Sequence, residues 1–437
     1  MTDCTLSEIE FPRCRGRRVV ADFGGGDISS NGGALLLSAA DRRLGLLSGL
    51  SRRLVDGRQA GKVGHKLLPL LRQRVYAVAL GYEDVNDHED LRDDLVLQTA
   101  CGRDRRLASP STVGRLDRAA DRAWAWAAHV SMVEAFIASF DGAPEELVLD
   151  FDATDDAVHG RQVGRFFHGY YDCYCFLPLY VFCGDHLLVS YLRPSNIDGA
   201  KHAWAILALL VKRLRQRWPD VRIILRADSG FCRDPMLRWC ERHGVGYIVG
   251  LAKNTRLNGQ AEIWMALAEA AYHHSGEKQR LFVDLRYGAR SWKERRRVIA
   301  RLEHGPKGAN PRYVVTNLEG DGQHLYDKLY CQRGEMENRI KECQLDMFAD
   351  RTSCHDWWPN QFRLILSSLA YGLIEAIRRL ALEGSDMARA QAGTIRLKLL
   401  KIGAVVIRNT RRVALHLSTA CPDKALFHLA AAKLKPG

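Results

Sequence analysis

Three acidic segments, widely separated along the chain, contain the residues best suited to chemistry. LVLDFDAT includes Asp150 and Asp152, ILRADSGF includes Asp228, and QRGEMENRIK includes Glu337. The first two segments place an aspartate at or near the end of an apolar β-run, whereas the third places a glutamate in a helical pattern. Three carboxylates on two strands and a helix can hold two divalent cations beside a phosphodiester.

The first segment offers two aspartates for one ligand position. Asp150 and Asp152 are two residues apart on one strand, so their side chains point to the same side. Thr154 begins the exit from the strand, which favours Asp152 at the catalytic edge and leaves Asp150 as the alternative. Asp228 ends VRIILRAD before a Ser-Gly turn, and neighbouring strand ends would bring it close to Asp152. Because two nearby carboxylates repel, a bound cation explains this pair better than a structural role does.

The third segment has the periodicity of a helix with one buried side. An apolar stripe recurs at positions i, i+4, i+7 and i+11, formed by Met336, Ile340, Cys343 and Met347. Glu337 lies at the edge of this stripe, where it can face a sheet, whereas Glu335 falls on a different, solvated part of the helix. Arg333, one turn before Glu337, can pair with it or bind a phosphate.

The elements around the first two carboxylates follow a recognisable order. Strands are predicted at LVLDFDAT, at VGRFFHGYY and on both sides of the Gly-Asp turn in FLPLYVFCGDHLLVSYLR. The helix DGAKHAWAILALLVKRLRQRW, the strand VRIILRAD, a helix from Asp234-Pro235 to His243-Gly244 and the strand GYIVGLA come next. Antiparallel strands followed by alternating helices and strands predict a ribonuclease H-like α/β core.

The whole chain is predicted to be α+β with five regions. Residues 1–140 form a mostly helical region, interpreted as either a plain bundle or a DNA-reading domain. Residues 141–252 and 328–385 form the two parts of the core, separated by a mainly β insertion at 253–327 that begins with a short helix. Residues 386–437 form a basic C-terminal region with ten Lys or Arg residues against two Asp.

Composition narrows the class of protein and its partner. A hydrophobic content of 47% is ordinary for a globular protein, and no apolar run is long enough for a transmembrane helix, so no membrane partner is expected. The N-terminal stretch lacks an apolar secretory core, and the twelve scattered cysteines are interpreted as reduced thiols of a cytoplasmic protein. A formal charge of +13 and a pI near 9.2 favour a polyanionic partner.

Other candidate sites are weaker. Cys173, Cys175, Cys183 and His186 lack the paired knuckles of a zinc site, and the cysteines are interpreted as core thiols. The run from Arg295 to Arg297 fits either a solvated surface or a DNA clamp. Trp357 and Trp358 fit either the core or a surface that stacks on an unpaired base.

Taken together, the motifs resemble those of a known family. LDFDATDD, HGRQ, YYDCYCFLPLYVF, LRPSN, LRADSGFCRDPMLRWCERHGVGYIVGLAKNTRL, PRYVVTNL and QRGEMENRIKE are similar to segments of insertion-sequence transposases of the DDE class. Within the insertion-sequence-four-like group, the resemblance is closest to the insertion-sequence thirteen-eighty family, and it spans nearly the whole chain.

The resemblance implies a catalytic and metal-binding triad of Asp152, Asp228 and Glu337 that uses two Mg²⁺ or Mn²⁺ ions. The family signature Y-x-x-R-x-x-x-E-x₆-K matches Tyr330, Arg333 and Glu337, but Gln344 stands at its lysine position. Lys341, one turn away, is the expected substitute. The DNA-binding candidates are Tyr330, Arg333, Lys341, Arg193, Arg295, Arg296 and Arg297.

The resemblance further implies a bacterial, cytoplasmic and nucleoid-associated enzyme. It would bind the terminal inverted repeats of its element, hydrolyse the DNA ends and join them to target DNA, as a homodimer when two ends are synapsed. Two alternatives remain: an inactive or domesticated DNA-binding descendant, and a ribonuclease H-like nuclease that never joins strands. The N-terminal helices and the basic C-terminal region are both candidates for recognition of the DNA ends.

Overall fold

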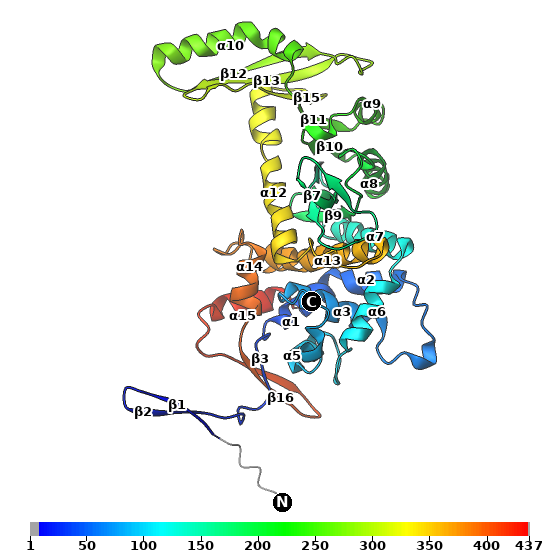
Figure 1. Cartoon of the computed structure of the whole chain (residues 1–437), viewed down its shortest axis with the longest axis vertical. Helices are drawn as coiled ribbons and strands as arrows, with labels where there is room; N and C mark the ends of the chain where they lie inside the picture. Colours follow the sequence, from blue (N-terminus) through cyan, green and yellow to red (C-terminus); the bar gives the residue numbers. More distant parts are fainter. Residues whose placement is uncertain (1–7, 436–437) are drawn as a thin grey trace, which may run out of the picture. The chain divides into compact units, whose positions relative to one another are not determined.

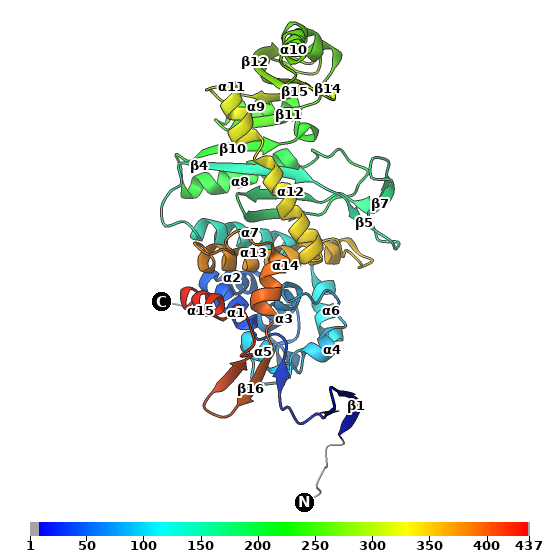
Figure 2. The same ribbon diagram turned by 90° about the vertical axis from the view of Figure 1, so that its left-hand side faces the viewer.

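The computed structural model describes residues 8–435, which fold into two compact units. One unit contains the residues up to Asp117 together with those from Leu373 onward, and the other runs from Arg118 to Gly372. Figures 1 and 2 show the course of the chain through them. Helices and a mixed sheet confirm the α/β character expected from the sequence. In the part of the chain that is described, no helix has both the length and the apolar character needed to span a membrane.

The first unit combines helices from the N-terminal part of the chain with elements from its C-terminal part. The N-terminal elements are β1 (Ile9–Cys14), β2 (Arg17–Ala21), β3 (Ile28–Ser29), α1 (Ala34–Leu44), α2 (Leu46–Arg53), a 3₁₀ turn (Ala60–Lys62), α3 (Leu67–Ala79), α4 (His88–Leu91), α5 (Leu95–Ala100) and α6 (Pro110–Ala119). The C-terminal elements are the end of α13 (Trp357–Ala381), α14 (Ala392–Ile395), a π-helical turn (Arg396–Leu400), β16 (Ala404–Arg408), β17 (Val413–Leu417) and α15 (Lys424–Lys433).

Two consecutive glycines join these distant parts of the first unit. The backbone N–H of Gly32 donates to Ile402 O at 2.8 Å, and that of Gly33 donates to Leu400 O at 3.1 Å. A Cβ atom on Gly33 would lie only 1.9 Å from Leu399 O, so no larger residue fits this approach. Beside this contact, β3 pairs with β16. The segment DISSNGG, which contains β3 and both glycines, therefore docks against the basic C-terminal region.

The second unit is built on one large sheet. Its sheet strands are β4 (Glu146–Ala153), β8 (Leu179–Cys183), β9 (His186–Tyr191), β10 (Arg222–Ala227), β11 (Gly246–Leu251), β12 (Gln279–Tyr287), β13 (Arg296–Gly305), β14 (Gly308–Ala309) and β15 (Arg312–Thr316). Its helices include α7 (Arg122–Ala138), α8 (Ala203–Arg217), α9 (Asp234–Arg242), α10 (Thr255–Ser275), α11 (Gly322–His324) and α12 (Arg333–Lys341). The helix α7, which the sequence grouped with the N-terminal region, lies in this unit and packs on β9.

The strand order of the sheet is β12-β13-β15-β11-β10-β4-β8-β9, with β14 paired to β13. The strands β4, β10 and β11 are parallel, whereas β8 and β9 form an antiparallel hairpin next to β4. The helices α8 and α9 cover one face of the sheet and α12 lies on the other (Figure 1). The carboxyl ends of β4 and β10 therefore meet at one edge, close to α12.

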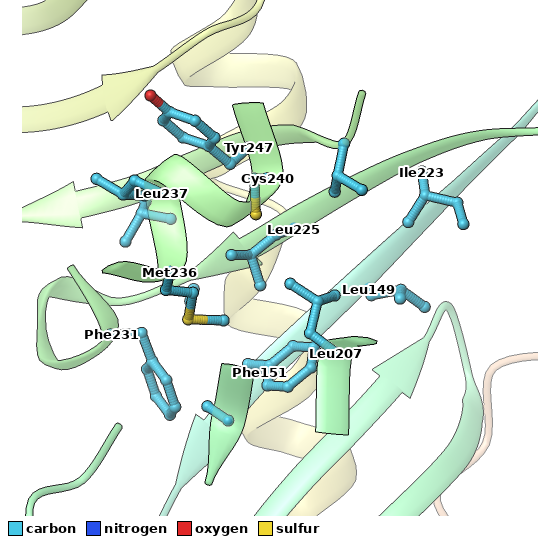
Figure 3. Close-up of a cluster of buried hydrophobic side chains, with 14 of the residues drawn as sticks. Leu149, Phe151, Leu207, Ile223, Leu225, Phe231, Met236, Leu237, Cys240 and Tyr247 are labelled. Atoms are coloured by element: carbon cyan, nitrogen blue, oxygen red, sulfur yellow. The ribbon is translucent and has the colours of Figure 1, made fainter. Parts of the chain in front are cut away.

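Side-chain alternation along β4 separates apolar residues from acidic ones. Leu149 and Phe151 point into the main core, where they meet Leu225 of β10 and Leu207 of α8 (Figure 3). Because successive residues of a strand face opposite sides, the intervening aspartates face the α12 side of the sheet. The predicted strand thus has one apolar face and one acidic face.

One predicted strand belongs to a different sheet. The segment VGRFFHGYY contributes β6 (Phe166–His168) to a small three-stranded sheet with β5 (Asp156–Ala157) and β7 (Cys173–Phe176), in the order β5-β7-β6. Between β4 and α8 the chain therefore adds only the antiparallel strands β8 and β9 to the large sheet. The expectation for this segment was wrong because β6 pairs with β7, and β7 pairs in turn with β5.

The predicted insertion extends the large sheet. Its strand β15 pairs antiparallel with β11, and β13 and β12 follow in the same sheet. Its helix α10 has 21 residues and is longer than the short helix expected from EIWMALAEAAYHH. Asn254 caps the start of α10 by accepting from Leu257 N at 3.1 Å, and Gly276 ends it in a left-handed conformation.

We predict that Gly33→Ala destabilises the first unit by about 1–3 kcal/mol, the usual cost of overpacking. The added methyl group would overlap Leu399 O and force the backbone at Gly33 away from Leu399 and Leu400. Chemical denaturation followed by circular dichroism measures this loss. The matched control is Gly57→Ala, since a Cβ at Gly57 has open space around it. Equal stability of the two variants would contradict the tight docking of this turn.

Candidate active site

The register of β4 and β10 places two of the predicted carboxylates side by side. Asp150 is paired with Arg226 and Phe151 with Ala227 in this parallel ladder. The next residues are Asp152 on β4 and Asp228 directly after β10, on the same face and at the same sheet edge. An Asp228 carboxylate oxygen accepts from Gly230 N at 2.9 Å, which caps the 3₁₀ turn Ser229–Phe231.

Asp150 has a structural partner. The guanidinium of Arg226 donates to both of its oxygens, at 2.5 and 2.7 Å, and Asp150 is only 2% exposed. The third donor of this guanidinium, Nη1, binds Leu329 O at 2.6 Å. Burial raises the pKa of Asp150, and Arg226 opposes that rise. Asp150 is thus fully engaged, which leaves Asp152 as the candidate ligand of this strand.

Glu337 lies on α12 with the expected neighbours. All four residues of its apolar stripe are buried: Met336, Ile340, Cys343 and Met347. The side chain of Glu337 is 49% exposed. A π-helical turn (Leu325–Tyr330) precedes α12 and another (Glu342–Asp346) follows it. Such turns often occur near functional residues, because they shift the side chains that follow them.

Arg333 connects the helix to the sheet. Its Nη2 donates to Glu337 Oε1 at 2.7 Å, and its Nη1 donates to Asp152 Oδ2 at 3.2 Å. One guanidinium therefore bridges the first and third predicted carboxylates, although 180 residues of sequence separate Arg333 from Asp152. Burial lowers the pKa of Arg333, but Asp152 and the other nearby acids outweigh this and raise it.

The pKa of Asp152 is shifted by burial and by the charged side chains around it. Burial contributes most to raising the pKa of Asp152 to about 6, and the charges of Asp228 and Glu337 add to the rise. Arg333 acts in the opposite direction. At a pH above that pKa the carboxylate of Asp152 is ionised, and a nearby cation would stabilise this charged form. The three predicted acids thus share one electrostatic environment.

Tyr330 forms part of the wall of the site. It is mostly buried, and this burial raises the pKa of its hydroxyl. A Cβ atom on Gly250 would lie 2.7 Å from Tyr330 Oη and 2.7 Å from Ser229 N. Glycine at position 250 therefore lets Tyr330 approach the turn that follows Asp228.

The carboxylates fit divalent cations in their chemistry. Oxygen donors of this kind suit Mg²⁺ and Mn²⁺. Over residues 8–435 the structure contains no group of three or more acidic, histidine or cysteine side chains close enough to hold one ion. Arg333 instead offsets part of the negative charge of Asp152 and Glu337. The donor types match a metal site, and a cation would relieve the repulsion from Asp228 and Glu337 that adds to the raised pKa of Asp152.

The predicted DNA-binding arginines differ in their surroundings. Arg193 is fully buried and donates to three backbone carbonyls, those of Leu177, Gly199 and Lys201. Its expected role at DNA was wrong, because the side chain supports the turn after β9.

Arg296 was also wrongly expected at a DNA surface. It is buried between Asp234 and Glu241, with which it forms ion pairs. Arg297 pairs with Asp284 and is partly exposed. Arg295 is exposed at the surface.

The position of the family's lysine faces the loop after β4. Gln344 donates from its Nε2 to Asp155 O at 2.9 Å. Lys341, the proposed substitute, is exposed on α12. A glutamine amide thus positions the loop that continues from Asp152.

Two buried charges in the site region were not anticipated. Arg226 lies two residues before Asp228 in an otherwise apolar strand, and that placement was the available signal. Asp156 is buried in β5. Its Oδ2 accepts from Thr352 Oγ1 at 2.9 Å, while its Oδ1 has no hydrogen-bond partner.

We predict that Asp150→Ala lowers the free energy of unfolding by about 3–5 kcal/mol, because it leaves Arg226 buried and unpaired. Urea denaturation of the metal-free protein measures the change. The control is Asp284→Ala, which removes the partner of the more exposed Arg297 and should cost about 1 kcal/mol or less. A cost for Asp150→Ala no greater than for this control would contradict the structural role of the Asp150–Arg226 pair.

Asp156 gives a pH-dependent prediction. Burial raises its pKa, and the nearby charges of Asp350 and Asp155 add to the rise. The resulting stabilisation is complete below the unfolded pKa and is lost as pH rises through the folded pKa. Asp156→Asn should therefore match wild type near pH 4 and exceed it by about 1–3 kcal/mol at pH 8. Denaturation at both pH values tests this, with exposed Asp220→Asn as a control expected to change little; wild-type stability of Asp156→Asn at pH 8 would refute it.

Comparisons with known proteins place the chain in a family. A search of curated proteins found no match. Among solved structures, a piggyBac transposase in a synaptic complex with hairpin DNA is similar, with 13% identity and a TM-score of 0.40 over 83% of this chain and 78% of that one. The family model described as Transposase DDE domain group 1 matches residues 11–436. With this match over nearly its whole length, the chain belongs to the DDE-domain transposases of group 1.

Proposed function

We propose that this chain is an active DNA transposase whose catalytic residues are Asp152, Asp228 and Glu337. The observation that carries the proposal is the register of β4 and β10, which sets Asp152 beside Asp228, together with the Arg333 bridge to Glu337. In this proposal the enzyme cleaves DNA at the ends of its element and joins the freed ends to target DNA. The element would belong to the insertion-sequence thirteen-eighty family within the insertion-sequence-four-like group.

The strand order supports a ribonuclease H-like core for this reaction. The strands β9-β8-β4-β10-β11 are adjacent in the large sheet, with an antiparallel hairpin on one side and parallel strands on the other. The central strand β4 supplies Asp152, and its parallel neighbour β10 is followed by Asp228. Along the chain the elements of this part follow the order β4-β8-β9-α8-β10-α9-β11, and β12, β13 and β15 extend the sheet beyond β11.

The three carboxylates would hold two Mg²⁺ or Mn²⁺ ions. When bound, such ions activate the attacking oxygen and stabilise the leaving oxygen of a phosphodiester. The residues of the chain set the conditions for binding. Asp152 is charged above a pKa of about 6, and Arg333 balances part of the charge of the site. In this proposal Tyr330, in the π-helical turn before α12, and Arg333 and Lys341 on α12 contact DNA phosphates.

The first unit is our candidate for recognition of the inverted repeats. It unites both parts of the chain that the sequence singled out for end recognition, the N-terminal helices and the basic C-terminal region. Arg408, Arg411 and Arg412 are exposed on the hairpin of β16 and β17. Exposed arginines can neutralise phosphates along a duplex. We further propose a homodimer on DNA, since two ends must be brought together, in the bacterial cytoplasm at the nucleoid.

We predict that Asp152→Asn, Asp228→Asn and Glu337→Gln each lower Mg²⁺-dependent DNA cleavage at least about 100-fold, since a catalytic cation contributes several kcal/mol. The assay uses supercoiled plasmid that carries the coding region with its native flanking DNA, and it scores cleavage and joining separately. Glu335→Gln is the matched control on the same helix and should keep wild-type activity, because Glu335 is exposed and makes no side-chain hydrogen bond among the described contacts.

The outcomes separate the alternatives. Cleavage without joining would indicate a nuclease, and DNA binding without cleavage by wild-type protein would indicate an inactive descendant. Full activity in Asp228→Asn would refute the assignment of the site.

A further inference from the structure

A second surface lies on the small sheet beside the candidate active site. Its strands β6 and β7 form a hairpin in which Phe167 and Tyr174 are directly paired, with ring centroids 5.6 Å apart. Both side chains are largely exposed, at 54% and 49%. The guanidinium of Arg165 lies over the Tyr174 ring, 4.5 Å from its centroid. One face of the hairpin thus presents two aromatic rings and a cation to solvent.

The base of this hairpin is firmly held. Val163 N donates to His355 O at 2.9 Å, and Ser195 Oγ donates to Phe166 O at 2.8 Å. Gly164 has a φ of +88°, and a Cβ there would lie 2.5 Å from the ring of Trp357. Trp357 also packs edge-on against Phe176 of β7. Trp357 therefore anchors the hairpin, and the exposed rings further along it are the ones available to a ligand.

The small sheet follows directly on the strand that carries Asp152, because β5 begins three residues after β4 ends and pairs with β7. The backbone N–H of Asp172 donates to His168 O at 2.9 Å and closes a tight turn that carries Tyr170 and Tyr171. Burial, with further contributions from Asp155 and Asp152, raises the pKa of Tyr171 to about 12, as expected for a hydroxyl near these acids. Tyr170 is 85% exposed, and its ring lies 5.0 Å from that of Tyr171. The exposed rings therefore continue from the hairpin face to the margin of the site.

The chemistry of this surface fits nucleic acid better than protein. Aromatic rings in solvent carry a cost that a binding partner removes. Between Arg161 and Tyr174 the chain has two arginines and one acidic residue, Asp172. Rings interleaved with arginines bind unpaired bases by stacking, and the arginines attract the phosphates between them. A duplex would shield its bases from such rings, whereas an opened strand exposes them.

We propose that the hairpin from Arg165 to Tyr174 is a stacking platform for unpaired nucleotides of the DNA strand next to the cleaved phosphodiester. Phe167, Tyr170 and Tyr174 supply the rings, and Arg165 supplies the positive charge. This inference rests on the proposed function, because it assumes that DNA lies at Asp152. It assigns to the hairpin a role in holding DNA open at the site, separate from the carboxylates that act on it.

The test compares single-stranded and duplex DNA without catalysis. Binding of a fluorescein-labelled oligothymidylate and of a labelled mixed-sequence duplex is measured by anisotropy in EDTA. Phe167→Leu and Tyr170→Leu keep apolar bulk but remove a ring, and each should weaken oligothymidylate binding about tenfold or more. Duplex binding should change by less than about twofold. Phe167→Tyr and Tyr174→Phe, which keep a ring, should retain wild-type affinity for the single strand.

A matched control lies on another element of the same unit. Trp264 of α10 is similarly exposed, and Trp264→Leu should leave oligothymidylate binding unchanged. Wild-type affinity in the Phe167 and Tyr170 leucine variants would overturn the proposal. An equal loss for single-stranded and duplex DNA would also overturn it, since it would make the hairpin a general DNA contact.

The result can be separated from the test of catalysis. If ring-dependent binding is found but wild-type protein never cleaves DNA, the platform stands and the proposed enzyme fails. If cleavage is found but the ring variants bind the single strand normally, the enzyme stands and the platform fails. Circular dichroism of each variant confirms that the fold is intact before its binding is measured.

Discussion

The geometry of the candidate site depends on one buried ion pair. Arg226 on β10 binds both oxygens of Asp150 on β4 and also the carbonyl oxygen of Leu329, just before α12. Three segments that the chain brings from far apart are joined by a single guanidinium. Breaking this pair would leave a buried charge without a partner, which costs free energy. The contact therefore strongly favours one arrangement of the three segments. Each carboxylate lies close in the sequence to a residue that takes part in this contact. Asp152 is two residues beyond Asp150, Asp228 is two residues beyond Arg226, and Glu337 is about two helical turns beyond Leu329. The contact therefore helps to fix the positions of all three carboxylates.

The two aspartates of β4 have opposite roles although they share one face of the strand. The parallel register sets Asp150 opposite Arg226, whereas the next pair on that face is Asp152 beside Asp228. The first pair is of opposite charge and is stable when buried, and the second is of like charge and carries a raised pKa at Asp152. A slip of two residues between the strands would place both aspartates next to different partners. The register of the ladder therefore determines which carboxylate is structural and which is available for a cation.

Much of the site could be predicted from the sequence, because local patterns of apolar residues indicate where the three acidic residues lie on their strands and helix. The strand ends at Asp152 and Asp228 and the buried stripe beside Glu337 follow from apolar periodicity, which each segment expresses by itself. The partners of charged residues do not follow from local patterns. Arg193 and Arg296 look like surface cations in the sequence, but both are buried. Backbone carbonyls from neighbouring segments of the chain bind Arg193, and carboxylates far away in the sequence bind Arg296. In the same way, the pairing of β6 with β7, and of β15 with β11, depends on contacts between segments that periodicity leaves unspecified.

Arg333 offsets part of the repulsion among the three carboxylates. Its guanidinium supplies one positive charge to Asp152 and Glu337, and this lowers the pKa of Asp152 against the effects of burial and of Asp228. The pKa of Asp152 still lies near 6, chiefly because the carboxyl is buried and in addition because Asp228 is close. Asp228 shares the repulsion but has no arginine partner among the described ion pairs, and its hydrogen bond from Gly230 is neutral. The residual negative charge is therefore concentrated between Asp152 and Asp228, at the sheet edge rather than along α12, and that edge is where a divalent cation would be most strongly attracted.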